Sequence, residues 1–196
     1  KNYGLKKVII STYQATSGAG NEGMAELEKE TRRVLKGEKA GNNLFSYPIP
    51  FNLIPHIDSF QENGYTREEM KVVWETHKIF GDESIPISCT CVRVPIMRAH
   101  SESVVVETEK PINPEDVRKI FENTPGIVVK DDIWNNVYPM PLTSSGQYNV
   151  EVGRIRQNLI FKEHGLEFFV SGDQLLKGAA LNAVQIGELI VKKRFG

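Results

Sequence analysis

The sequence predicts an α+β fold, in which one mixed β-sheet carries helices packed on one face. Three observations support this prediction. Apolar and β-branched runs of strand length recur along the chain, and helical patterns with recognisable caps lie between them. The connections include both tight turns and long crossovers, so strands of both directions are expected. A chain of 196 residues is about the size of one domain.

The first half of the chain predicts a strand, a glycine turn and two helices. The expected elements are a strand at 8–12, a glycine turn at 17–20, a helix from 24 to about 37, an irregular and partly buried segment at 38–64, and a helix at 67–80. Thr66 and Glu69 have the Thr-x-x-Glu spacing of a capping box, which places the start of the second helix. Apolar residues at helical spacing are expected to form the buried stripes: Met24, Leu27, Val34 and Leu35 in the first helix, and Met70, Val73, Trp74 and Phe80 in the second.

The second half predicts short strands and two further helices. The expected elements are strands at 85–95 and 101–109, a helix from 113 to about 125, strands at 127–130, 153–163 and 166–171, and a helix from 173 to about 194. Asn113 before Pro114 and two acidic residues is typical of a helix start. Gly165 is expected in the turn between the last two strands. The last helix is apolar over much of its surface, so we expect it to pack against the sheet.

Composition argues against several classes of protein. The 24 Lys and Arg balance 25 Asp and Glu, so the chain has no excess of positive charge for nucleic acid. No apolar run reaches the length of a membrane span, and no signal peptide opens the sequence. Two cysteines are too few for a secreted disulfide framework. We therefore expect a cytoplasmic protein that binds neither nucleic acid nor membrane.

The cysteines allow two interpretations. A thiol near an imidazole such as His100 can act as a nucleophile. Alternation along the strand instead places Cys89 and Cys91 on its apolar face, where a free cysteine behaves as a small hydrophobic residue. The second interpretation is favoured. No metal site is expected, because four ligands with suitable spacing are not present.

Three other features carry charge or backbone chemistry. The Ser-Gly-Ala-Gly segment at 17–20 lies between a strand and a helix, and its glycines allow close approach of a ligand. A plain tight turn has the same pattern. Glu68 and Lys71 are one turn apart, which by default indicates a solvated ion pair. Arg93 interrupts the apolar end of a strand, so its guanidinium needs a partner, for which a carboxylate ligand is a candidate.

Taken together and in this order, several segments resemble aspartate-semialdehyde dehydrogenase. These segments are STYQATSGAG at 11–20, SCTCVRVP at 88–95, RAHSE at 98–102, VGRIR at 152–156 and KGAALNA at 177–183. The resemblance covers only the carboxyl-terminal part of that family. It implies that residues 1–196 are the substrate-binding and dimerisation domain of a longer two-domain enzyme, with the fold of the carboxyl-terminal domain of glyceraldehyde-3-phosphate dehydrogenase. The nucleotide-binding domain and the nucleophilic cysteine would then precede Lys1, which agrees with the absence of an initiating Met.

The resemblance implies a homodimer that carries out NADP-dependent reductive dephosphorylation of 4-phospho-L-aspartate to L-aspartate 4-semialdehyde. This reaction serves the biosynthesis of lysine, methionine, threonine and diaminopimelate, and the fragment alone is expected to be inactive. The implied site residues are His100 as acid and base, Gln14 as the active-site glutamine, Arg93 for the substrate α-carboxylate, Glu68 for its ammonium group, Lys71 for the phosphate, and Ser17, Gly18 and Gln174 for NADP.

Two departures and two alternatives accompany this resemblance. Ala99 stands where the family commonly has Gly, which matters only if its φ is positive, and Cys89 replaces a smaller residue. One alternative is a non-catalytic dimerisation or binding module derived from such an enzyme. The other is an acyl transferase with Cys91 as the nucleophile.

Overall fold

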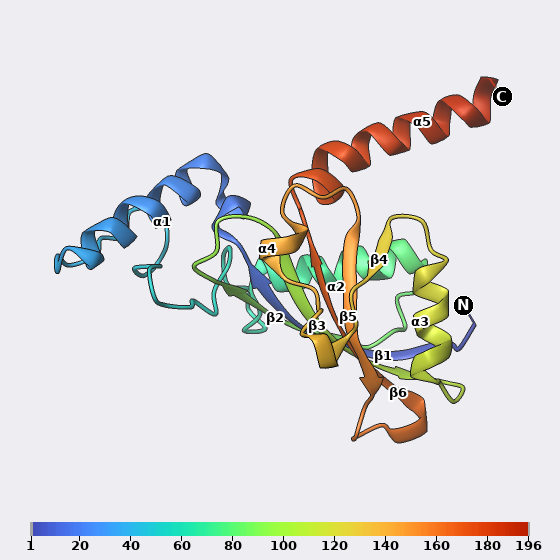
Figure 1. Cartoon of the computed structure of the whole chain (residues 1–196). Coiled ribbons are helices and arrows are strands. Elements are labelled where there is room, and N and C mark those ends of the chain that lie inside the picture. The colour runs from blue at the N-terminus through green and yellow to red at the C-terminus, as the bar shows by residue number, and fades with distance from the viewer. Residues whose placement is uncertain (1, 196) are drawn as a thin grey trace.

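The computed structural model describes residues 2–195 and contains one six-stranded mixed sheet (Figure 1). Lys1 and Gly196, the ends of the expected domain range, lie outside the described residues. The strands are β1 (Leu5–Gln14), β2 (Ile87–Arg93), β3 (His100–Thr108), β4 (Ile127–Val129), β5 (Val150–Gln157) and β6 (Gly165–Gly172). Their order across the sheet is β2-β1-β3-β6-β5-β4. The pairs β1–β2 and β4–β5 are parallel and the other three are antiparallel, which confirms the mixed sheet.

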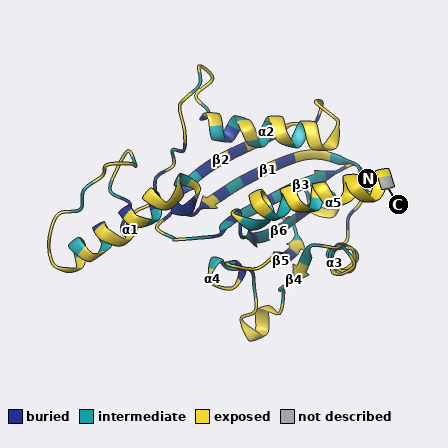
Figure 2. Ribbon diagram, turned by 90° about the horizontal axis from the view of Figure 1, so that it is seen from above, coloured by how far each residue is buried: buried dark blue, intermediate teal, exposed yellow. Residues whose placement is uncertain are grey.

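Two helices pack on the same face of this sheet. The helices are α1 (Gly20–Leu35), α2 (Arg67–Phe80), α3 (Pro114–Glu122), α4 (Pro141–Ser144) and α5 (Leu181–Phe195). Val72 of α2 packs on a core that includes Val8 and Val104, and Val117 of α3 packs on a core with Leu166. Figure 2 shows the buried residues of β1 and β2 running beside α2. Paired residues share a face of a sheet, so these contacts place both helices on one side.

The predicted helix starts are confirmed by their hydrogen bonds. The Thr66 side chain accepts from the Glu69 N–H, and the Glu69 carboxylate accepts from the Thr66 N–H. The second Glu69 oxygen accepts from the Cys91 N–H at 3.0 Å, so the same residue also ties α2 to β2. Asn113 accepts from the Glu115 N–H at the start of α3. Local polar pairs of this kind are readable from sequence because both partners lie within one turn.

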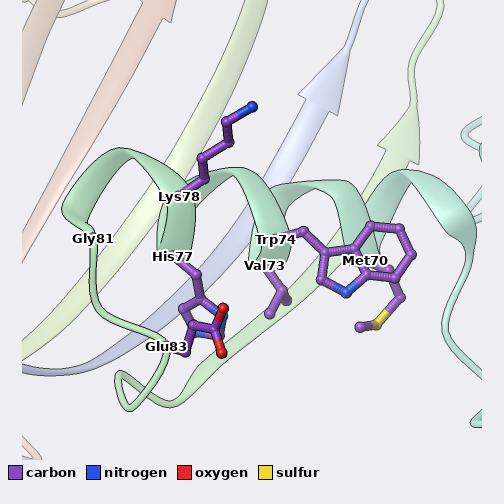
Figure 3. Close-up of a pocket in the computed structure, with 7 residues that line it drawn as sticks. All are labelled: Met70, Val73, Trp74, His77, Lys78, Gly81 and Glu83. Atoms are coloured by element: carbon purple, nitrogen blue, oxygen red, sulfur yellow. The ribbon is translucent and has the colours of Figure 1, made fainter.

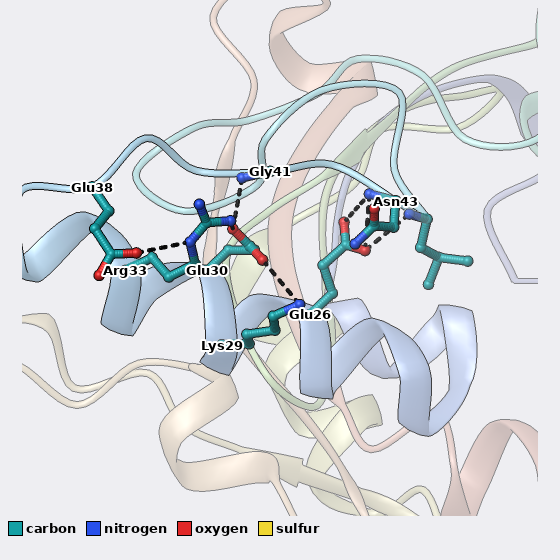
Figure 4. A network of polar contacts seen from close by, with 8 residues as sticks. Glu26, Lys29, Glu30, Arg33, Glu38, Gly41 and Asn43 are labelled. Carbon is teal, nitrogen blue, oxygen red and sulfur yellow. Dashed lines mark hydrogen bonds and ion pairs between the residues drawn. The ribbon is translucent and has the colours of Figure 1, made fainter.

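The expected apolar stripe of the first helix is wrong in part. The buried positions of α1 are Gly23, Glu26, Leu27 and Glu30, whereas Leu35 is exposed. Figure 4 shows why two acids are buried. Glu30 accepts from the Gly41 N–H at 2.6 Å, and Glu26 accepts from the N–H groups of Asn43 and Leu44. These carboxylates replace the backbone partners that the irregular segment lacks, and so hold it against α1.

The expected stripe of the second helix also needs correction. Trp74 and Phe80 are exposed, and the buried residue of α2 is Glu69. Trp74 instead borders a cavity of about 930 Å³ formed by α2 and the loop after it, with the neighbours drawn in Figure 3. The sheet contact is made by Val72, because the capping box turns that side of α2 toward β2.

The expected packing of the last helix on the sheet is wrong. A π-helical turn, Leu176–Ala180, precedes α5, and α5 projects away from the sheet (Figure 1). Its exposed apolar residues are Val184, Ile186, Leu189, Ile190 and Val191. Within residues 2–195, no helix is both long and apolar enough to span a membrane. Apolar composition alone therefore did not identify which surface this helix contacts.

The strand expected at 153–163 is shorter and begins earlier, at Val150–Gln157. Asn158 ends it, because its side-chain oxygen accepts from the N–H groups of Ile160 and Phe161 and fixes a turn. Gly165 is the first residue of β6 and not part of that turn.

A β-bulge follows Gly153 in β5, where the register shifts. Arg154 has a φ of 55°, and the buried Asp131 carboxylate accepts from the N–H groups of Arg154 and Ile155. A side chain at Gly153 would begin only 1.9 Å from the Lys130 carbonyl oxygen. Backbone geometry thus requires a glycine at position 153 of the VGRIR segment.

Candidate active site

Three predicted site residues form a row across neighbouring strands. Gln14, the last residue of β1, pairs with Arg93, the last residue of the parallel strand β2. The next pair along β1 and β3 joins Tyr13 to Ser101, so Gln14 comes opposite His100. The three side chains lie on the helix-covered face, because directly paired residues point to the same side.

The start of α2 adds an acid and a base to this row. The Gln14 side-chain N–H donates to Glu68 at 3.0 Å, and the Lys71 ammonium donates to the other Glu68 oxygen at 3.0 Å. Thr12 donates to the Gln14 side-chain oxygen at 3.0 Å, which fixes the orientation of the amide. Burial would raise the pKa of Glu68, but the hydrogen bonds from Gln14 and Lys71 outweigh it and lower the pKa. Glu68 is therefore an ionised carboxylate at neutral pH.

Arg93 is a buried cation that has more N–H donors than its one hydrogen bond uses. Its side chain is 7% exposed, and its Nη1 donates to the Ala15 carbonyl at 2.7 Å. The guanidinium also lies over the ring of Phe45, with its carbon 5.9 Å from the ring centre. A cavity of about 440 Å³ opens beside it. A guanidinium carries five N–H donors, so this one can still receive a carboxylate from the cavity.

His100 is held as a neutral ring. The Ala15 N–H donates to His100 Nδ1 at 3.1 Å, so the neutral ring carries its proton on Nε2. Burial, followed by the positive charge of Arg93, lowers the pKa of His100 to about 4. At neutral pH the ring therefore presents an N–H donor at Nε2 and carries no charge.

Gly18 lies between the two key side chains. A methyl group added there would begin 2.8 Å from Arg93 Nη1 and 3.1 Å from His100 Nε2. Absence of a side chain at Gly18 is thus what keeps the space between the cation and the imidazole open.

Ser17 and Gln174 meet at the side of this space. The Gln174 side-chain N–H donates to Ser17 Oγ at 2.5 Å. Among residues 2–195, no hydrogen-bond partner meets the buried side-chain oxygen of Gln174. A cavity of about 330 Å³ is bordered by His100, Gln174 and Lys177. The structure brings together all eight residues singled out in the sequence, in two adjoining groups that share Gly18 and His100.

The cysteines lie in the core, as the alternation predicted. Cys89 and Cys91 are buried with their sulfur atoms 3.7 Å apart. A hydrogen bond with Cys91, together with burial, raises the pKa of the Cys89 thiol well above its ordinary value. No group of three or more His, Cys, Asp or Glu in the described part of the chain is arranged to hold a metal.

Ala99 does adopt the backbone conformation that the family's usual glycine would accept without strain. Its φ is 72° and it is fully buried. The left-handed conformation costs an L-residue roughly 1–2 kcal/mol of conformational free energy. The bend at Ala99 turns the chain into β3 and aims His100 at the site.

Sequence reasoning missed several supporting residues. Thr12 is two positions from Gln14 and so shares its face, which the strand period could have revealed. Ala15 acts only through its backbone, and Phe45 comes from the irregular segment, so neither gave a signal.

Comparison with known proteins identifies the family of this chain. Residues 1–177 match the family model described as semialdehyde dehydrogenase, dimerisation domain. Aspartate-semialdehyde dehydrogenase of Aquifex aeolicus is 49% identical over 97% of this chain and 56% of its own length. The Bacillus subtilis enzyme of that name is 45% identical over 98% of this chain and 58% of its own length. The chain thus spans a little over half the length of these relatives.

A solved structure shares the whole fold. It is aspartate semialdehyde dehydrogenase II of Vibrio cholerae complexed with ASA, with a TM-score of 0.94 and 45% identity over 98% of this chain and 56% of its own. The family model, the relatives and the shared fold lead to one assignment, and this chain belongs to the semialdehyde dehydrogenase family as a dimerisation domain.

Proposed function

We propose that this chain is the substrate-binding and dimerisation domain of an NADP-dependent aspartate-semialdehyde dehydrogenase, which converts 4-phospho-L-aspartate to L-aspartate 4-semialdehyde and phosphate in the cytoplasm. The observation that carries the proposal is the row of Arg93, Gln14 and His100, joined to Glu68 by a hydrogen bond. Relatives of the same name at 45–49% identity support it. The V. cholerae protein was solved with ASA, which further supports a semialdehyde substrate.

The alternation of charge in the site suits a phosphorylated amino acid. Such a substrate presents an α-carboxylate, an ammonium group and a phosphate. Arg93 binds the carboxylate with the donors left free beside Ala15. Glu68 receives the ammonium, for which its lowered pKa keeps it ionised. Lys71, a point charge at the surface end of the row, meets the phosphate.

His100 and Gln14 act on the reacting carbonyl. The thiol that forms the thioester belongs to a segment outside this sequence. His100 presents its Nε2–H as a hydrogen-bond donor to the oxygen that develops negative charge, because its Nδ1 is occupied by the Ala15 N–H. Gln14 orients the substrate with a neutral amide, since Thr12 fixes its oxygen and leaves the N–H side toward Glu68.

NADP fits the side of the site near Gln174. The unpartnered Gln174 oxygen can accept from the carboxamide of a nicotinamide, and Gly18 leaves room for close approach of a planar ring. When bound, NADPH supplies the hydride of the reduction. Ser17 holds the Gln174 amide in place at the border of the 330 Å³ cavity. The rest of the nucleotide site lies outside the chain.

The proposed homodimer forms through the sheet face that α2 and α3 leave open. Ile9 and Tyr13 are exposed there, and Tyr13 packs on the Phe169 ring at 6.0 Å between centres. An apolar face of this kind, on a domain of a family called dimerisation domains, fits a second copy of the chain.

Kinetics of the longer protein that contains this chain test the function. His100→Ala is expected to lower kcat by orders of magnitude, because the hydrogen-bond donor to the developing negative charge is lost. Arg93→Lys is expected mainly to raise KM for the semialdehyde, because a point charge replaces a fork. Arg32→Lys, on the exposed side of α1, is the matched control and should change neither constant.

Two outcomes would contradict the proposal. The first is a wild-type long protein that has no semialdehyde-dependent NADPH formation, which would favour a non-catalytic module. The second is NADP-linked turnover by a homogeneous preparation of residues 1–196, which would mean that the essential thiol lies within this chain.

A further inference from the structure

A buried carboxylate, Asp173, borders the same cavity as His100 and Gln174. Asp173 follows the end of β6 and precedes Gln174, and it is fully buried. Its Oδ2 meets Arg98 Nε at 2.7 Å and accepts from the Gly146 N–H at 2.6 Å. Its Oδ1 accepts from the Leu175 N–H at 3.1 Å. One side chain thus joins three separate segments of the chain.

Each of these segments carries or supports a proposed site residue. Arg98 is two residues before His100, and its carbonyl accepts from Ser145 Oγ at 3.2 Å. The bond to the Leu175 N–H bends the chain around Gln174 at the start of the last helical segment. A displacement of Asp173 would therefore reach both His100 and Gln174.

A chain of buried hydroxyl groups completes the support. Ser101 donates to Ser171 at 3.0 Å, and Ser171 lies 2.8 Å from the Ser144 hydroxyl. Ser171 also donates to the His100 carbonyl at 3.5 Å. These contacts tie the strand that carries His100 to β6 and to α4, on the side of the sheet opposite the site.

We propose that Asp173 is a positioning residue that holds His100 and Gln174 in fixed relation to each other, acting through Arg98, Gly146 and Leu175; the proposal rests on the proposed function. Without its charge, Arg98 would keep an unpaired guanidinium two residues from the imidazole. The Arg98 side chain is partly exposed, but its Nε is buried and would lose the carboxylate that faces it. Nothing in the proposed reaction requires Asp173 to touch a substrate.

Asp131 provides a matched control within the same chain. It is also buried, pairs with one arginine, Arg118, and accepts from the N–H groups of Arg154 and Ile155. Its contacts hold the bulge of β5 and involve none of the proposed site residues. Asp131→Asn therefore reproduces the loss of a buried, arginine-paired carboxylate without a change at His100.

The experiment compares Asp173→Asn with Asp131→Asn in the longer protein that contains this chain. Ring signals of His100 are followed by NMR with labelled histidine, and kcat is measured with L-aspartate 4-semialdehyde, phosphate and NADP. Both variants are expected to lower the unfolding temperature. Only Asp173→Asn should shift the His100 ring signals and lower kcat by tenfold or more.

The titration of His100 gives a readout that general destabilisation would not move. Arg93 from β2, Glu68 from α2 and Asp173 are the charges that act on this ring, and Asp173 is one that favours its protonation. Its removal should shift the His100 titration to lower pH, while Asp131→Asn leaves it unchanged.

Unchanged His100 signals and kcat in Asp173→Asn would overturn the proposal. Arg98→Ala serves if Asp173→Asn does not fold, because Arg98 is partly exposed, and it should shift the same signals. Arg98→Lys, which keeps the charge, should restore most of the wild-type signal. A wild-type protein without turnover would refute the proposed function, whereas the NMR comparison would still decide the positioning role.

Discussion

Substitution of Gly18 by alanine tests the geometry of the site most directly. The added methyl group would begin 2.8 Å from Arg93 Nη1 and 3.1 Å from His100 Nε2, both closer than ordinary van der Waals contact. Gly18 does not have a positive φ, so the backbone itself accepts alanine. The clash therefore falls on the two side chains.

The size of the expected loss in kcat/KM follows from the interactions that Arg93 loses when it moves. An added methyl group that forces side chains out of position costs about 1–3 kcal/mol. A shifted guanidinium would also weaken its 2.7 Å hydrogen bond to the Ala15 carbonyl, and bonds to charged groups contribute about 1.5–3 kcal/mol. If about 1.4–2.8 kcal/mol of this is lost from substrate binding, kcat/KM falls roughly 10- to 100-fold.

The assay is steady-state kinetics of the longer protein with L-aspartate 4-semialdehyde, together with thermal unfolding. Gly187→Ala is the control, because the space around Gly187 in α5 is open and alanine favours a helix. Gly18→Ala should lose kcat/KM, whereas Gly187→Ala should keep it.

A Gly18→Ala enzyme with kcat/KM within twofold of wild type would refute this reasoning. It would mean that Arg93 and His100 do not flank a shared binding space. A crystal structure of the variant would then show whether the two side chains moved apart without functional effect.

Three further predictions concern stability. Gly153→Ala should prevent folding or cost more than about 4 kcal/mol, because the 1.9 Å contact is with the Lys130 backbone and no side chain can move aside; soluble yield and urea unfolding measure it. Because the pKa of His100 falls from 6.5 unfolded to about 4 folded, the unfolded state binds the proton first as pH drops. Stability should therefore fall between pH 6.5 and pH 4, by roughly 3 kcal/mol at most, and urea unfolding of His100→Gln over this range should show a smaller loss. Glu30→Ala should release the segment after α1, since the Gly41 N–H loses its acceptor, and limited proteolysis should cut within 38–64 faster than in wild type or in a Glu28→Ala control.

Local signals predicted the elements well where both partners are close in sequence. The caps at Thr66 and Asn113 are confirmed because each closes within one helical turn. The mixed sheet is also confirmed. It was predictable because the segments between the expected strands include both tight turns and long crossovers. The turn at Asn158 was missed, since a side chain that accepts two backbone N–H groups can end a strand without Gly or Pro.

Burial was predicted less well, because apolarity shows that a surface avoids water but not what it contacts. The apolar α5 projects from the sheet, whereas the acids Glu26 and Glu30 of α1 are buried. Unpaired backbone N–H groups in a neighbouring segment decided the burial of these acids, and no periodicity within α1 encodes those groups.

The sequence by itself determined which chemical groups this protein carries and in what order, and the ordered segments were enough to indicate the family. Only the tertiary structure decided that Arg93, Gln14 and His100 form one row, because register between three strands sets it. The same holds for the neutral state of His100 and for Asp173, the carboxylate that joins Arg98 to Gly146. Burial and charge at a site are sums over residues far apart in the chain, so they exist only after folding has brought those residues together.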